Sequence, residues 1–176
     1  MAGALEGIEQ QVGRRDFASP PLHLWHPALS GDIPIRITTD GTWYHDGGVI
    51  RRESLVRLFA SILRREDDGE YYLVTPTEKW RIQVDLHPLV VTDITVGDGP
   101  LLRATLNTGL TLQVDETHPL SLEPTLGDVP VLQLDHGLSA LFSRAAWYRL
   151  ADMAQDLDGI ATVVSGDYRF ALESHQ

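Results

Sequence analysis

The sequence predicts an α+β fold built from two similar subdomains, residues 1–85 and 86–176, related by an internal duplication. We expect mostly antiparallel strands and one main helix in each subdomain. Short runs of alternating apolar and polar residues occur along much of the chain, two longer stretches have helical periodicity, and three motifs recur in the same order in both halves. With 43% hydrophobic and 22% charged residues, the composition is that of a globular protein.

The clearest strand signal lies in the first subdomain, where Ile33, Ile35 and Ile37 alternate with Pro and polar residues. This period of two is typical of a half-buried strand. Asp40-Gly41 follows as a predicted hairpin turn, because glycine tolerates a positive φ. Residues 42–44 are therefore expected to return as the second strand.

The clearest helix signal follows this hairpin. Five apolar side chains have the spacing of one helix face, and the acidic run at residues 66–69 is expected to end the helix. The five are Leu55, Leu58, Phe59, Ile62 and Leu63.

The remaining elements are predicted from shorter signals. A weak helical spacing marks residues 1–14, a long loop is expected around residues 118–127, and residues 138–154 are predicted to form the second long helix. Further strands are expected at residues 71–75, 79–85, 89–96, 101–106, 110–114, 129–134, 160–164 and 168–172.

The duplication is inferred from three pairs of similar segments in a conserved order along the chain. They are Gly31–Ile35 with Gly127–Val131, Leu55–Phe59 with Leu138–Phe142, and Trp80–Asp85 with Tyr168–Glu173. Two such units packed together would enclose a cleft, and ligands often bind at interfaces of this kind. We therefore expect a small ligand between the two halves.

Charge and composition exclude several classes of function. The chain has 14 basic and 25 acidic residues, a net charge of -11, so its field repels nucleic acids and anionic membranes. It has no cysteine, which excludes disulfides and thiol catalysis. Neither a signal peptide nor an apolar run of about 20 residues is evident, so we expect a cytoplasmic protein.

Known catalytic motifs do not occur in the sequence, so the prediction leans towards a protein that is not an enzyme and needs no cofactor. There is no Gly-rich phosphate loop, no nucleophile elbow and no His-Glu-x-x-His motif. One enzymatic alternative stays open, a hydrolase whose metal is held by His45, His118 and a carboxylate.

One hairpin, Thr75–Arg81, gathers groups that suit anion binding. Lys79 and Arg81 should share a face of their strand, because side chains alternate. With Arg51 or Arg52 near the start of the first helix they would form an anion pocket, where Trp43 or Trp80 could stack on a ring. The alternative is a polar hairpin tip closed by its own ion pair.

Four motifs, taken in series, resemble a bacterial family without assigned activity, the domain of unknown function family 1285. They are Asp40-Gly41-Thr42-Trp43-Tyr44-His45, Arg52-Glu53-Ser54-Leu55, Leu73-Val74-Thr75-Pro76-Thr77-Glu78-Lys79 and Thr117-His118-Pro119-Leu120. The resemblance implies a duplicated α+β core with a C-terminal half superficially like a pleckstrin-homology fold. It also implies a small, nucleotide-like ligand between the halves and a link to signal transduction.

The family has no established functional residues, so the candidate ligand-binding residues are the polar and aromatic ones in these motifs. They are Trp43, His45, Arg52, Thr75, Glu78, Lys79, Arg81 and His118. The favoured hypothesis is a non-catalytic module that binds a small anionic or nucleotide-like ligand. A scaffold that binds a protein partner, for example along a strand edge, is the main alternative.

Overall fold

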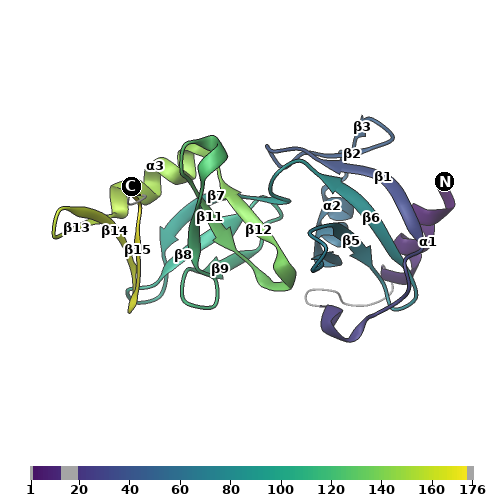
Figure 1. Ribbon diagram of the computed structural model, residues 1–176, viewed down its shortest axis with the longest axis horizontal. Helices are drawn as coiled ribbons and strands as arrows, with labels where there is room; N and C mark the ends of the chain where they lie inside the picture. The colour runs from purple at the N-terminus through teal and green to yellow at the C-terminus, as the bar shows by residue number, and fades with distance from the viewer. Residues whose placement is uncertain (1, 13–19, 174–176) are drawn as a thin grey trace. The chain divides into compact units, whose positions relative to one another are not determined.

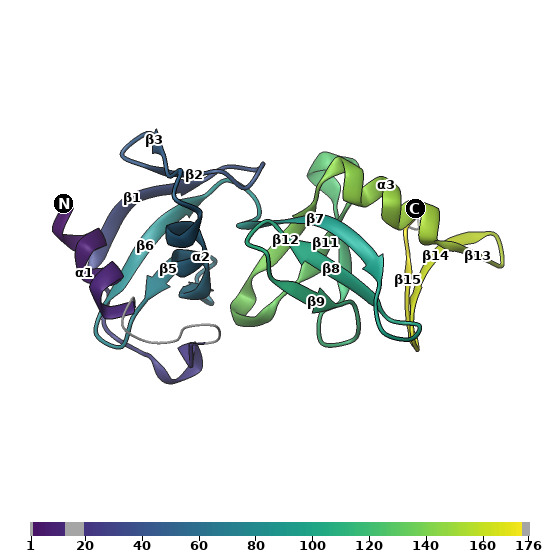
Figure 2. The ribbon, with the colours of Figure 1, turned by 180° about the vertical axis from the view of Figure 1, so that it is seen from behind.

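The computed structural model describes residues 2–12 and 20–173 and divides the chain into two compact units (Figures 1 and 2). The N-terminal domain comprises Met1–Pro88 with His136–Leu138, and the C-terminal domain comprises Leu89–Asp135 and Ser139–Gln176. Each domain has a six-stranded sheet, and the second has an additional three-stranded sheet. The predicted α+β fold with two domains is confirmed.

Sheet A belongs to the N-terminal domain and has the strand order β3-β2-β1-β6-β5-β4. All neighbours are antiparallel except β1 and β6, which run parallel. The strands are β1 (Gly31–Ile37), β2 (Trp43–His45), β3 (Gly48–Val49), β4 (Leu63–Arg65), β5 (Tyr71–Val74) and β6 (Lys79–Val84). The helical elements are α1 (Ala2–Val12), η1 (Leu22–Leu24) and α2 (Glu53–Ser61).

The core of the N-terminal domain lies between sheet A and α2. Ile33, Ile35 and Ile37 of β1 are buried, as their alternation predicts. Trp43 of β2 is also buried and stacks on Phe59 of α2, with ring centroids 6.2 Å apart. Because side chains alternate along a strand, Asp32 and Arg36 of β1 and Tyr44 of β2 lie on the opposite, open face of the sheet.

Sheet B belongs to the C-terminal domain and has the strand order β10-β11-β12-β7-β8-β9, with β12 and β7 parallel. Its helix α3 (Arg144–Met153) packs against β7 and β12 (Figure 2). The strands are β7 (Leu89–Val96), β8 (Leu102–Leu106), β9 (Thr111–Gln113), β10 (Leu120–Glu123), β11 (Val129–Gln133) and β12 (Ser139–Phe142). The small sheet contains β13 (Gln155–Leu157), β14 (Ile160–Ser165) and β15 (Tyr168–Ala171), and the 3-10 turns are η2 (Pro124–Leu126) and η3 (Asp135–Gly137).

The two large sheets share one topology. Each consists of two three-stranded units, and the first strand of the first unit pairs in parallel with the last strand of the second, β1 with β6 and β7 with β12. Reading outward from this parallel seam gives the same strand order in both domains, as a duplicated core requires. The structural repeat therefore relates β1–β6 to β7–β12.

The three sequence pairs that suggested the duplication do not follow this structural repeat. Leu55–Phe59 lies in α2, whereas Leu138–Phe142 leads into strand β12, so this match compares a helix with a strand. Trp80–Asp85 lies at the centre of sheet A, whereas Tyr168–Glu173 lies in the small sheet. The particular alignment was wrong because apolar spacing alone does not distinguish a short buried strand from a helix.

Three element predictions also need correction. The helix predicted at 138–154 is instead β12 followed by α3, because the Ser143 side chain accepts a hydrogen bond from the Ala146 amide at 3.2 Å and caps a new helix. The expected loop at 118–127 contains β10. Leu63 begins β4, so residues 66–69 form a hairpin turn between β4 and β5.

Candidate functional site

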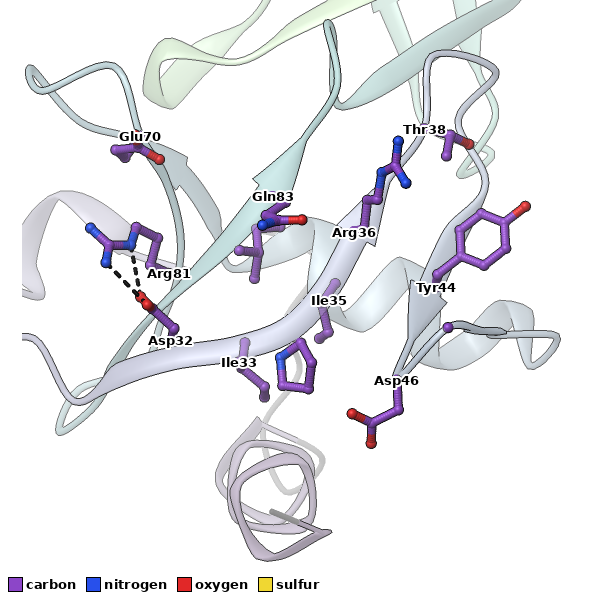
Figure 3. A pocket seen from close by; sticks show the side chains of 13 residues that line it. Asp32, Ile33, Ile35, Arg36, Thr38, Tyr44, Asp46, Glu70, Arg81 and Gln83 are labelled. Carbon is purple, nitrogen blue, oxygen red and sulfur yellow. Dashed lines mark hydrogen bonds and ion pairs between the residues drawn. The ribbon is translucent and has the colours of Figure 1, made fainter.

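The open face of sheet A contains a hollow of about 1120 Å³. Strands β1, β2 and β6 contribute most of its lining, and the turns after β1, after β2 and before β5 supply the rest (Figure 3). Figure 3 shows Arg81, Gln83, Arg36 and Tyr44 along this face, with Glu70 beyond Arg81. All of these residues belong to the N-terminal domain.

A β-bulge shapes the floor of the hollow. Asp32 pairs with Arg81 and Arg36 with Gln83, so three residues of β1 lie opposite the single residue Ile82. Pro34, at the centre of the bulge, has no amide hydrogen and leaves no donor unpaired there. Because β1 has two extra residues, the alternation stays in phase, and the side chains on both sides of the bulge reach the same face.

Two bidentate ion pairs hold the arginines of this face. Arg81 Nε and Nη2 donate to the two carboxylate oxygens of Asp32 at 2.7 and 3.1 Å. Arg36 Nε and Nη2 donate to Asp85 at 2.8 Å each. These hydrogen bonds lower the pKa of both aspartates and raise the pKa of both arginines. A guanidinium has five N–H donors, so each arginine keeps donors for a further acceptor.

Four polar side chains form a row, three from the neighbouring strands β2, β1 and β6 and one from the residue directly before β5. Tyr44 of β2 pairs with Arg36 of β1, and Arg36 pairs with Gln83 of β6. Tyr71 pairs with Ile82, so Glu70, one residue earlier, lies beside Gln83. The row therefore presents a carboxylate, an amide, a guanidinium and a phenol in that order (Figure 3).

A partly buried charge network fixes the turn that carries Glu70. Glu66 Oε1 accepts from Lys79 Nζ at 2.8 Å, and Glu66 Oε2 accepts from Arg64 Nη2 at 2.6 Å. Burial raises the pKa of Glu66, but the hydrogen bonds from Lys79 and Arg64 outweigh it and leave the pKa lowered. The Glu66 amide also donates to the Glu70 carbonyl at 3.0 Å, so the network holds Glu70 in place.

Tyr72 extends this network towards the hollow. Its hydroxyl donates to Asp68 Oδ2 at 2.5 Å, and Lys79 Nζ lies 4.6 Å from the centre of its ring. The hydrogen bond to Asp68, followed by burial, raises the pKa of Tyr72 to about 12. Tyr72 also pairs with Arg81 across β5 and β6, which places the network beside the Arg81–Asp32 ion pair.

Among the residues predicted from the sequence, Arg81 lines the hollow. Thr75 is buried, and its Oγ1 accepts from the Glu78 amide at 3.0 Å, which closes the hairpin turn between β5 and β6. Lys79 is bound to Glu66, so its ammonium group holds the fold together. The hairpin thus contains both a residue of the hollow and residues that stabilise the turn.

The other predicted residues lie elsewhere. Trp43 is in the core, and His45 Nε2 lies 3.4 Å from Asp46 Oδ2. Arg52 forms an ion pair with Glu9 of α1. His118 is in the C-terminal domain, where its Nε2 is 3.7 Å from Asp135 Oδ1.

Residues 2–12 and 20–173 contain no group of three or more His, Cys, Asp or Glu side chains arranged to hold a metal ion. None of the helices in these ranges has the length and apolar character that crossing a membrane requires.

Sequence reasoning missed most residues of the hollow. The exposed positions of β1 carried a usable signal, because Asp32 and Arg36 alternate with buried isoleucines. Glu70 and Gln83 had no comparable signal. Their proximity to Arg36 depends on the parallel pairing of β1 with β6, whose partners are far apart in the sequence.

Comparison with known proteins gives the family. The model of the N-terminal domain of DUF1285, a domain of unknown function, matches residues 20–86, and the model of the DUF1285 C-terminal domain matches residues 88–172. The chain belongs to the DUF1285 family. This confirms the resemblance seen in the sequence motifs.

Two crystal structures of DUF1285 proteins are similar to this chain. The protein from Silicibacter pomeroyi DSS-3 is 37% identical, with a TM-score of 0.84 over 95% of this chain and 93% of the other. The protein from Shewanella baltica OS155 is 32% identical, with a TM-score of 0.59 over 68% of this chain and 91% of the other. No curated protein matches the chain.

Proposed function

We propose that this DUF1285 protein is a non-catalytic module that binds a small polar ligand in the hollow on sheet A. The observation that carries the proposal is the row of Glu70, Gln83, Arg36 and Tyr44 along a preformed concavity of about 1120 Å³. This volume is slightly above the roughly 300–1,000 Å³ of typical small-molecule sites. The proposal puts the ligand on the N-terminal domain, whereas the sequence led us to expect it between the two halves.

The ionisation of the hollow supports binding rather than catalysis. Hydrogen bonds lower the pKa of Asp32 and raise the pKa of Arg36 and Arg81, so all three keep their charges near neutral pH. A general acid or base works best with a pKa near the working pH. Fixed charges suit recognition, and the role in signal transduction implied by the family resemblance would begin with such a binding step.

Thermal unfolding of the full chain with a panel of probes tests the proposal. The panel contains ATP, pyrophosphate, citrate, triglycine and spermidine. A probe that binds the folded protein stabilises it and so raises the melting temperature. At a probe concentration of a hundred times its Kd, the free energy of unfolding increases by about 2.7 kcal/mol. We expect at least one probe to do so in the wild type.

Two matched arginine variants locate the binding. Arg36 and Arg149 are both exposed and both paired with an aspartate, but Arg149 lies in the C-terminal domain. Arg36→Gln should lower the affinity for the probe that stabilises the wild type about tenfold or more, because a hydrogen bond to a charged group is lost. Arg149→Gln should leave its affinity unchanged. If no probe stabilises the wild type, or both variants lose affinity equally, the proposal is wrong.

A further inference from the structure

The hollow contains more carboxylates than guanidinium groups. Three carboxylates line it, from Asp32, Asp46 and Glu70, against the guanidinium groups of Arg36 and Arg81. Both arginines already bind an aspartate. A polyanion such as a nucleotide phosphate would therefore meet an excess of negative charge, although the arginines offer it donors.

The two ends of the row have opposite chemistry. The Glu70 carboxylate forms no ion pair or side-chain hydrogen bond with any residue in the described part of the chain, so it can accept from a ligand. At the other end, the Tyr44 hydroxyl has no such partner either, and Arg36 beside it keeps donors beyond its bonds to Asp85. Glu70 can thus accept from a cationic donor beside the Arg81–Asp32 ion pair, and Arg36 and Tyr44 can donate to an anionic acceptor beside Asp85.

The spacing of these ends sets the length of a ligand. Glu70 directly precedes β5 and Arg36 is on β1, with β6 between these two strands. Two strand separations are roughly 10 Å. An extended peptide spans about 3.3–3.6 Å per residue, so three residues cover the same distance. The Gln83 amide lies between the ends and can both donate to and accept from a peptide group.

From this polarity and spacing we infer that the hollow takes a short peptide-like zwitterion, with its ammonium group at Glu70 and its carboxylate at Arg36 and Tyr44. The inference rests on the proposed function and names its ligand class. It replaces the nucleotide-like ligand expected from the sequence resemblance with one whose two charges match the two ends of the row.

Calorimetric titration of the full chain with triglycine and its two blocked forms tests this assignment. Acetylating the amine of triglycine removes the charge meant for Glu70, and amidating its carboxylate removes the charge meant for Arg36. We expect wild-type protein to bind triglycine and each blocked form to bind about tenfold more weakly or worse, through loss of a charged hydrogen bond.

Variants show whether the charges act where the structure places them. The Glu70→Gln variant should bind triglycine more weakly than the wild type does, but it should bind the acetylated form with wild-type affinity. The Arg36→Gln variant should also bind triglycine more weakly, but it should bind the amidated form with wild-type affinity. Glu116→Gln, an exposed glutamate of the C-terminal domain, makes the same charge change and should have no effect. Melting curves without ligand confirm that each variant is folded.

The outcomes separate this inference from the proposed function. If ATP or pyrophosphate binds in an Arg36-dependent manner and triglycine does not, the zwitterion assignment is overturned and the binding module stands. The assignment is also overturned if Glu70→Gln and Arg36→Gln leave the affinity for triglycine unchanged. If no probe of the panel binds, both fail together.

Discussion

The parallel seams of the two domains have the same topology and opposite chemistry. In the C-terminal domain, β12 pairs with β7 through Ala140, Leu141 and Phe142, all buried, and α3 packs against both strands. In the N-terminal domain, the seam of β1 with β6 has one buried face and one open face with the Arg81–Asp32 and Arg36–Asp85 ion pairs.

The open seam of the N-terminal domain contributes less to stability than the covered seam of the C-terminal domain. Parallel strands are usually covered on both faces, which is the arrangement of β7 and β12. One face of the seam of β1 and β6 is not buried, and the exposed ion pairs on that face contribute little stability. The seam of β1 and β6 is thus polar and uncovered at the position where the other domain has core, and the proposed binding role would account for this difference.

The largest expected effect is on the covered seam. Phe142→Ala should cost about 3–5 kcal/mol of unfolding free energy, because it opens a cavity in the core of the C-terminal domain. Leu110→Ala, at a half-exposed position of the same domain, should change it by about 0.5 kcal/mol or less. Urea unfolding measures both. Similar small losses in the two variants would mean that the C-terminal seam is not core.

A smaller loss is expected from the network behind the hollow. Glu66→Gln leaves the Lys79 and Arg64 side chains without their anionic partner and should cost about 1–3 kcal/mol. Asp67→Asn, an exposed change in the same turn, is the control. Equal urea midpoints for the two variants would contradict the role given to Lys79 in holding this turn.

The hydrogen bond between Tyr72 and Asp68 predicts an alkaline dependence of stability. Tyr72 has a pKa raised from 10.0 to about 12 in the fold, so its contribution is complete below pH 10 and is lost as pH rises towards 12. In the Tyr72→Phe variant, the loss of stability that comes from ionisation of Tyr72 above pH 10 should be absent. Melting temperatures of both proteins between pH 9 and about 12 test it, and parallel curves would argue against the bond.

The smallest effect is expected on the open seam itself. Reversing either charge of the Arg81–Asp32 pair should lower the melting temperature only slightly, because both side chains are exposed. The exchanged pair, Asp32→Arg with Arg81→Asp, should restore it. A loss as large as that of Phe142→Ala would show that the two seams serve the same structural purpose.

Local patterns predicted much of the fold from the sequence. The alternation of Ile33, Ile35 and Ile37 identified β1, and the helical spacing from Leu55 identified α2. These signals arise within one element, where period and burial are directly linked. They failed at Ser139–Phe142, where four consecutive buried residues have no period that separates a strand from a helix.

The candidate site was less accessible to prediction because long-range pairing creates it. Arg81 was singled out, but its partner Asp32 is 49 residues away and reaches it only through the parallel register of β1 and β6. Lys79, next but one along the strand, looked equivalent until Glu66 was placed beside it. The residue types were visible in the sequence, while the register that assigns their roles was not.

The most direct test of the difference between the seams is a backbone amide NMR titration of the full chain with triglycine. We predict shifts in β1, β2, β6 and the residues around Glu70, with the amides of β7 and β12 unmoved. Shifts centred on β7 and β12, or none around Arg36 and Glu70 at saturating triglycine, would contradict the account.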